Sequence, residues 1–136
     1  MGIDDMTWKF RCEWKGEIPL PPAYTFPQAF NYLNPETNSF YILEKGNNYI
    51  QCGGAKEKCA VELREYGEDG TFRHFVFFDP AGSTEPEMIP MSNGGVTRQK
   101  RHCLHISKAI QLFTAYFNGE PWPAELEMED ITDQFK

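Results

Sequence analysis

The stretch between Ser39 and Asp79 constrains the fold more than any other part of the chain, because β-prone segments alternate there with glycine-containing turns. Four segments are rich in apolar and aromatic residues, and each predicts a strand: Phe40–Lys45, Tyr49–Cys52, Cys59–Tyr66 and Thr71–Asp79. The turns expected between them are Gly46-Asn47-Asn48, Gly53-Gly54 with Ala55-Lys56, and Gly67–Gly70. Connections this short join antiparallel neighbours, so the stretch predicts an antiparallel meander.

The residues before the meander predict one more strand and a short helix. Apolar and polar residues alternate from Thr7 to Trp14, which indicates a half-buried strand. Its buried face is expected to carry Trp8, Phe10, Cys12 and Trp14. Prolines interrupt the next segment, so we expect Lys15–Tyr24 to be a loop that does not pair in a sheet. Thr25 is the expected N-cap of a helix that ends near Leu33.

The residues after the meander predict a loop followed by the main helix. Pro80–Gly95 is polar and rich in glycine and proline, so we expect a long surface loop there. Val96–Leu104 is expected to form an edge strand or an irregular segment. Lys108–Asn118 carries apolar residues at helical spacing, with Ser107 as the expected N-cap and Gly119 as the stop.

A last short strand is indicated near the end of the chain, where Leu126 and Met128 alternate with acidic residues. The predicted fold is therefore α+β, with residues 1–136 as a single domain. It contains a single antiparallel sheet, with one main C-terminal helix and a shorter N-terminal helix packed on it. The four cysteines show no CxxC pair, and we expect them to be free and buried: Cys12, Cys52, Cys59 and Cys103.

The charge of the chain restricts its partners. The formal net charge is −7 and the isoelectric point is about 4.9, whereas binding to nucleic acid requires a basic surface. No apolar run has the length of a bilayer span, and the N-terminus lacks the apolar core of a signal peptide. We therefore expect a cytoplasmic protein that binds neither nucleic acid nor a membrane.

The sequence shows no motif for catalysis, a cofactor or a metal. The glycine doublets at 53–54 and 94–95 lack the lysine of a phosphate-binding loop. His102 and His105 flank Cys103 in a segment that we expect to be a strand or loop, and in a strand their odd separation places the two imidazoles on opposite faces. The acidic residues Glu125 and Glu127, with Glu129, are expected along one strand face, which favours a solvated edge over an acid–base pair. We expect no enzymatic activity and no cofactor.

Acidic residues are concentrated at the C-terminus. The last eighteen residues hold six acids against a single lysine, a net charge of −5: Glu120, Glu125, Glu127, Glu129, Asp130 and Asp133. The preceding stretch from Arg98 to Lys108 holds four bases and no acid. This polarity has two interpretations: the segments pair within the molecule, or the acids form a docking surface for a basic partner.

The order of these motifs resembles immunity protein family 1 of bacterial polymorphic and contact-dependent toxin systems. The resemblance is carried by a Y-I-Q-x-x-G strand at Tyr49–Gly54, the Asp69-Gly70 hairpin, and the main helix with its stop. In that helix the matching positions are Ala109, Phe113, Phe117 and Gly119. The family's terminal tryptophan position is occupied by Met128, and the first forty residues carry none of these motifs.

The resemblance implies a non-enzymatic inhibitor that binds a cognate toxin, and family toxins are often nucleases or deaminases with basic clefts. The contact residues we expect are the six C-terminal acids, together with the loop Pro80–Gly95. A second hypothesis is a small-molecule or peptide-binding module whose pocket is formed by Trp8, Trp14, Phe75 and Phe77. A third is an enzyme that uses His102, Cys103 or His105.

Overall fold

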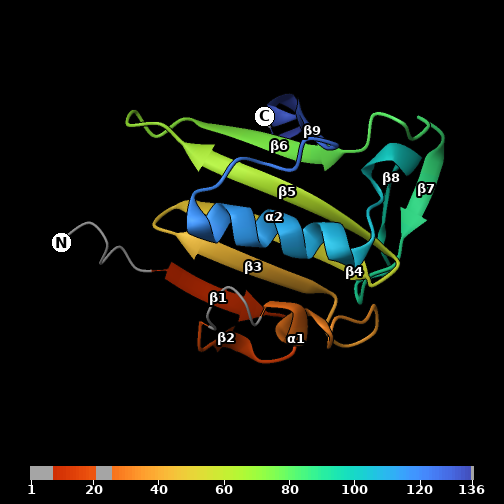
Figure 1. Cartoon of the computed structure of the whole chain (residues 1–136), viewed down its shortest axis with the longest axis horizontal. Helices are drawn as coiled ribbons and strands as arrows, with labels where there is room; N and C mark the ends of the chain where they lie inside the picture. Colours follow the sequence, from red (N-terminus) through yellow and green to blue (C-terminus); the bar gives the residue numbers. More distant parts are fainter. Residues whose placement is uncertain (1–7, 21–25, 136) are drawn as a thin grey trace.

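The computed structural model describes residues 8–20 and 26–135 and is built around a seven-stranded antiparallel sheet (Figure 1). Its strands, in chain order, are β1 (Trp8–Cys12), β2 (Gly16–Ile18), β3 (Phe40–Lys45), β4 (Asn48–Ala55), β5 (Lys58–Tyr66), β6 (Phe72–Phe78) and β9 (Glu127–Asp130). The other elements are α1 (Phe26–Phe30), the hairpin strands β7 (Pro86–Ile89) and β8 (Val96–Gln99), the 3-10 helix η3 (Lys100–His102), α2 (Ile106–Asn118) and the 3-10 helix η4 (Thr132–Phe135). The strand order is β2-β1-β3-β4-β5-β6-β9, so β2 and β9 form the two edges. The predicted α+β class is confirmed.

The meander forms as β3 to β6, with each strand paired to the next. The second turn is not where the sequence predicted it: Gly53 and Gly54 extend β4, and the chain reverses at Lys56-Glu57 instead. Gly54 has φ +132°, and a Cβ at this position would lie 2.5 Å from the carbonyl oxygen of Lys58. The glycine is therefore required by a close approach of two strands rather than by a turn.

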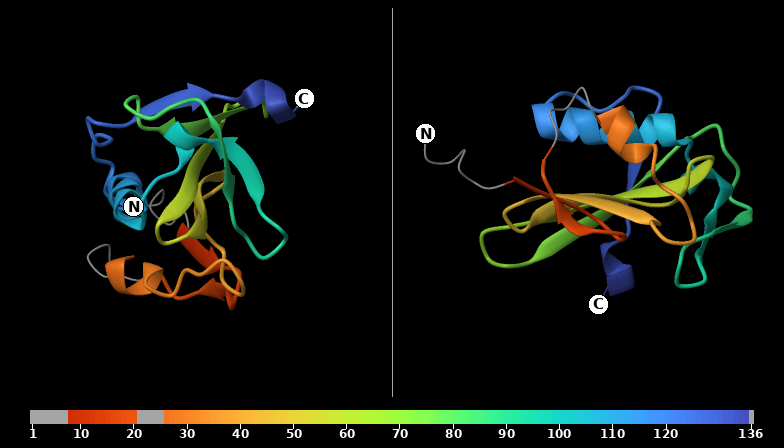
Figure 2. Two further views of the ribbon diagram at one scale, coloured as in Figure 1. Left: turned by 90° about the vertical axis from the view of Figure 1, so that its right-hand side faces the viewer. Right: turned by 90° about the horizontal axis from the view of Figure 1, so that it is seen from below.

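The two α-helices lie together on one face of the sheet (Figure 2). Leu43, Ile50 and Leu63 are in register on adjacent strands and are buried beneath them. The Phe30 ring of α1 packs edge-on against Phe113 of α2, with ring centroids 4.8 Å apart. Each fully buried side chain of this size stabilises the fold by about 1.5–3 kcal/mol, so this face contains the main core.

The opposite face of the sheet carries η4 and, at one end, the β7–β8 hairpin (Figure 2). This hairpin corrects two predictions, because β7 lies within the predicted loop Pro80–Gly95 and β8 pairs with β7 rather than with the main sheet. The structure therefore contains a second, two-stranded sheet in addition to the single sheet that was expected.

Three smaller predictions also need correction. β2 lies in the segment Lys15–Tyr24 that was predicted not to pair, because its residues precede the first proline and pair with β1. α1 ends at Phe30 rather than near Leu33. The N-cap of α2 is His105, whose ring accepts a hydrogen bond from the Ser107 amide, whereas Gly119 ends the helix with φ +68° as predicted. Thr7, residues 21–24 and Thr25 lie outside the described residues.

Candidate functional site

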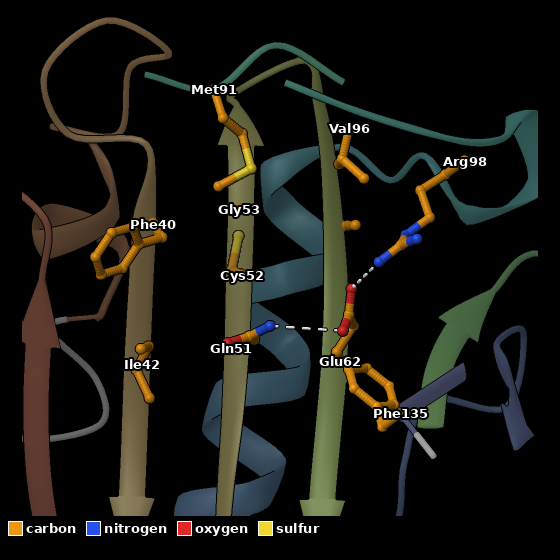
Figure 3. A pocket seen from close by; sticks show the side chains of 11 residues that line it. Phe40, Ile42, Gln51, Cys52, Gly53, Glu62, Met91, Val96, Arg98 and Phe135 are labelled. Atoms are coloured by element: carbon orange, nitrogen blue, oxygen red, sulfur yellow. Dashed lines mark hydrogen bonds and ion pairs between the residues drawn. The ribbon is translucent and has the colours of Figure 1, made fainter. Parts of the chain in front are cut away.

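A buried polar cluster lies on the face of the sheet opposite the helices. Glu62 of β5 is 7% exposed, and its Oε1 lies 2.7 Å from Nε2 of His74 on β6, which is 1% exposed. Arg98 of β8 donates from Nη2 to Glu62 Oε2 at 2.9 Å, and Gln51 of β4 lies 3.5 Å from Oε1 (Figure 3). The cluster therefore joins three strands of the main sheet to the β7–β8 hairpin.

The hydrogen bonds of this cluster define the tautomer of His74. Arg64 Nε, which can only donate, lies 3.0 Å from His74 Nδ1, so Nδ1 accepts and the proton sits on Nε2, facing Glu62. Burial acts to raise the pKa of Glu62, but the hydrogen bonds from His74 and Arg98 outweigh it and hold the pKa below the usual value. Glu62 is therefore an ionised carboxylate with its charge compensated by Arg98.

A cleft of about 390 Å³ opens beside the cluster, between the sheet and the hairpin (Figure 3). Its side chains are mostly apolar, and they include Phe40, Ile42, Gln51, Glu62, Met91, Val96, Arg98 and Phe135. The volume is sufficient for one large side chain or a small ligand. Because the walls are apolar and the floor holds a carboxylate and an amide, the cleft suits an apolar group that carries a hydrogen-bond donor.

The hairpin that covers the cleft is tethered at its tip by a second polar group. The Glu13 carboxylate accepts hydrogen bonds from the amide and the hydroxyl of Ser39, at 2.8 and 2.7 Å, and from the hydroxyl of Ser92. Hydrogen bonds from Ser39 and Ser92 lower the pKa of Glu13. Ser92 lies between β7 and β8, so this contact ties the hairpin tip to the end of β1.

A second cavity, of about 430 Å³, lies between β1, β2 and α1. Trp14 and Tyr32 line it and are 60% and 63% exposed. Of the four aromatic residues predicted to form a pocket, only Trp14 lines this cavity. Trp8 packs against the α2 residue Phe117 with ring centroids 5.0 Å apart, and Phe77 is buried against Trp122. The predicted four-residue aromatic pocket is therefore not assembled.

Of the six C-terminal acids, three belong to β9, and the other three lie before or after it in the chain: Glu120, Glu125 and Asp133. Glu127 and Glu129 share a face by strand alternation, as predicted, but Glu125 lies in the turn before the strand and binds Lys108 of α2. Asp130, on the other face, pairs with Arg73 at 2.9 Å. Hydrogen bonds from Thr132, reinforced by Arg73, lower the pKa of Asp130 to about 2. Glu120 is exposed after α2, and Asp133 is exposed in η4.

Part of this acidic charge is matched within the molecule. Glu129 Oε1 lies 2.9 Å from both Arg101 Nη2 and His102 Nε2, and Lys108 binds Glu125. Both Arg101 and Lys108 belong to the basic stretch identified in the sequence, so intramolecular pairing accounts for these contacts. Glu120 and Glu127 form no ion pair with any of the described residues.

His102, Cys103 and His105 do not converge on a common point. His102 is buried against Glu129, His105 caps α2, and the Cys103 thiol donates to the Gln99 carbonyl oxygen. Burial, with a smaller contribution from Glu87, raises the pKa of Cys103. All four cysteines are free; the other three are buried as predicted, whereas Cys103 is half-buried. The described residues contain no group of three or more histidine, cysteine or acidic side chains that could hold a metal ion.

The cluster around Glu62 was not predicted from the sequence, although polar and apolar residues alternate along this part of β5. Glu62 and Arg64 alternate with the apolar residues Val61 and Leu63 along β5 and lie on the other face of the strand. Their burial depends on the β7–β8 hairpin and η4, which cover this face. No local spacing in the sequence brings Arg98 to Glu62, thirty-six residues earlier.

No protein-family model matches the chain, and no curated protein matches its sequence. In the part of the chain that the structure describes, no helix has both the length and the apolar character needed to cross a bilayer.

Proposed function

We propose that this protein is a non-enzymatic immunity protein that binds and neutralises a cognate toxin domain in the cytoplasm. The observation that carries the proposal is the composition of the edge strand β9, where three of four residues are acidic and the fourth, Met128, is 39% exposed. Acidic side chains around an exposed apolar one match the polar rim and apolar centre of a protein contact, and their charge suits a basic partner.

Several of the acids in and next to β9 are available to a partner, whereas Glu129 is bound to Arg101 and His102 within the molecule. Glu127 has no internal ion pair among the described residues, and the Asp130–Arg73 and Glu125–Lys108 pairs lie at the surface. Surface ion pairs contribute little to stability, so they exchange readily for the cations of a partner.

A toxin that acts on nucleic acid provides the matching surface. Its substrate cleft must be basic to bind phosphates, and an acidic protein surface is attracted to such a cleft. Complementary charge raises the association rate and excludes acidic competitors. The net charge of −7 adds a long-range contribution in the same direction.

A second candidate function, the binding of a small molecule or peptide, is supported by the 390 Å³ cleft beside Glu62. If this is the function, substitutions in the cleft are expected to abolish binding of the small molecule or peptide, whereas substitutions on β9 are not.

The test uses the toxic domain encoded by the reading frame immediately upstream of this gene. Glu127→Lys, which breaks no internal ion pair, is expected to slow association several-fold at low salt, and Glu127→Lys with Glu129→Lys about tenfold. Protection of cells that express the toxin falls in the same order. The measurements are stopped-flow association at two salt concentrations and growth with the toxin induced.

The matched controls are Glu36→Lys and the pair Glu36→Lys with Glu68→Lys, which change the net charge equally at exposed turns away from β9. Circular dichroism verifies that every variant is folded. Equal association rates in the β9 and control variants would show that β9 is not the contact surface. An upstream domain that the native protein does not neutralise would refute the proposed function.

A further inference from the structure

The main chain of β9 has one unpaired side. Among the described residues, β9 is the last strand of the sheet and pairs only with β6, with Glu129 opposite Val76 and Glu127 opposite Phe78. Ile131 lies opposite His74 at a hydrogen-bonded position of the ladder: its amide donates to the His74 carbonyl oxygen at 2.8 Å, whereas the His74 amide donates to the Thr132 hydroxyl. Because such pairs alternate along antiparallel strands, Glu127 and Glu129 bond inward and the peptide groups of Met128 and Asp130 point outward.

These outward groups are uncovered. Within residues 8–20 and 26–135, no hydrogen bond reaches the main chain of Met128 or Asp130 from outside the sheet. Figure 2 shows β9 at the margin of the molecule, with the helices on one side of the sheet and η4 on the other. An exposed row of amides and carbonyls is a template on which another strand can pair.

We propose that an extended basic segment of the partner adds to β9 as an antiparallel eighth strand. The identity of the partner rests on the proposed function, whereas the docking geometry rests on the edge alone. A second copy of this chain is not the occupant, since antiparallel pairing of two β9 strands about Glu129 would place Glu129 opposite Glu129. The acidic residues thus exclude the chain itself and select for basic strands.

The side chains of β9 define the pattern of the added strand. Glu127 and Glu129 lie on one face, and Met128 and Asp130 on the other. An antiparallel strand runs past Asp130 first and Glu127 last, and its directly opposite residues are therefore basic, basic, apolar and basic. Main-chain bonds supply the geometry, and these four side chains supply the selectivity.

Proline at position 128 tests the geometry directly. The Met128 amide points outward, so Met128→Pro removes the donor on the free edge and leaves the inward bonds of Glu127 and Glu129 in place. Met128→Ala, the matched control, removes the side chain but keeps the amide. Both variants are compared with the native protein by thermal unfolding, which verifies that the edge substitution has not disrupted the fold.

The probe is a synthetic peptide with the core KKVK flanked by threonines, titrated into isotopically labelled protein and followed by NMR. We expect the Met128 and Asp130 amides to shift and to become protected from exchange. Met128→Pro weakens binding at least about tenfold, as expected for a lost main-chain bond and a blocked edge, and Met128→Ala weakens it less than about threefold. Methylating the peptide amides of the valine and the first lysine, which leaves the charge intact, abolishes binding.

The results separate this inference from the proposed function. Equal affinity of the proline and alanine variants, or no change at these two amides at millimolar peptide, overturns the strand addition. If the upstream toxin domain binds both variants equally but is sensitive to Glu127→Lys, the strand addition fails and the proposed function stands. If the peptide binds as described while no upstream toxin is neutralised, the strand addition stands and the proposed function fails.

Discussion

Glu62 places a carboxylate where only 7% of the residue is exposed, and side chains from three other strands surround it. Removing a charge from water is costly, and the cost is offset here by the Arg98 guanidinium and the hydrogen bond from His74. Removing one member of the cluster is therefore expected to be strongly destabilising, because the charge of its partner stays buried without compensation.

We predict that Glu62→Ala lowers the free energy of unfolding by about 3 kcal/mol, because it leaves Arg98 partly buried without a counter-charge and His74 without an acceptor. Urea denaturation followed by tryptophan fluorescence measures the change. Glu65→Ala, at an exposed position on the same strand, is the control and is expected to change the value by less than about 0.5 kcal/mol. A similar effect of the two substitutions would mean that the cluster is not coupled to folding.

The contribution of Glu62 to the free energy of unfolding is expected to depend on pH in a defined direction. The pKa of Glu62 in the folded protein is below the ordinary glutamate value of 4.5, so its contribution to stability is fully present above that value. The contribution is lost as the pH falls through the folded pKa. The difference in unfolding free energy between the native protein and Glu62→Gln is therefore expected to shrink below pH 4.5 and to be constant above it.

At the scale of elements, the sequence predicted those parts whose stability is local. β3 matches its predicted bounds, Phe40–Lys45, and α2 was recognised from its apolar spacing and Gly119. The β7–β8 hairpin was missed because its anchors are contacts between distant residues, such as Arg98 with Glu62 and Ser92 with Glu13.

In the candidate site, too, the features set by local sequence were predicted and those set by contacts between distant residues were not. The shared face of Glu127 and Glu129 follows from strand alternation and was predicted. The pairing of Glu129 with Arg101 and His102, and the cleft under the hairpin, depend on which elements pack together. Residue spacing alone does not contain that information.

The tether at the hairpin tip gives a prediction for local stability. Ser92→Ala removes one hydrogen bond to Glu13 and leaves those from Ser39 intact, so the hairpin should open more often while the sheet stays folded. We expect amide exchange over residues 86–99 to rise about fivefold, with a change of less than about 1 kcal/mol in global stability. Hydrogen–deuterium exchange with mass spectrometry measures both the hairpin and the sheet.

Ser83→Ala is the matched control, since the hydrogen bond that the structure describes for the Ser83 hydroxyl is local, from the Glu85 amide at 3.4 Å. If both serine substitutions left exchange of the hairpin unchanged, the contact with Glu13 would not restrain it.

At the scale of the whole molecule, the sheet ends in two edges that differ in their protection. β2 is only three residues long, whereas β9 has four residues and carries three acids. Short strands and charged side chains are the usual means by which edges avoid pairing with copies of themselves. The acidic β9 thus combines two properties: it repels another copy of the chain, and it attracts a basic partner.

This predicts that uncharged analogues of the three acids allow the protein to associate with itself. Glu127→Gln, Glu129→Gln and Asp130→Asn together keep the hydrogen-bond acceptors for Arg101 and Thr132 but remove the repulsion between two β9 strands. Sedimentation velocity is expected to detect dimers of this variant at concentrations where the native protein shows none.

The control, Glu36→Gln with Glu57→Gln and Glu68→Gln, has the same net charge and is expected to sediment like the native protein. In the dimer, the outward amides of Met128 and Asp130 become protected from exchange, which locates the contact at the edge. If both triple variants sediment alike, the acids of β9 are not what keeps this edge from pairing with itself.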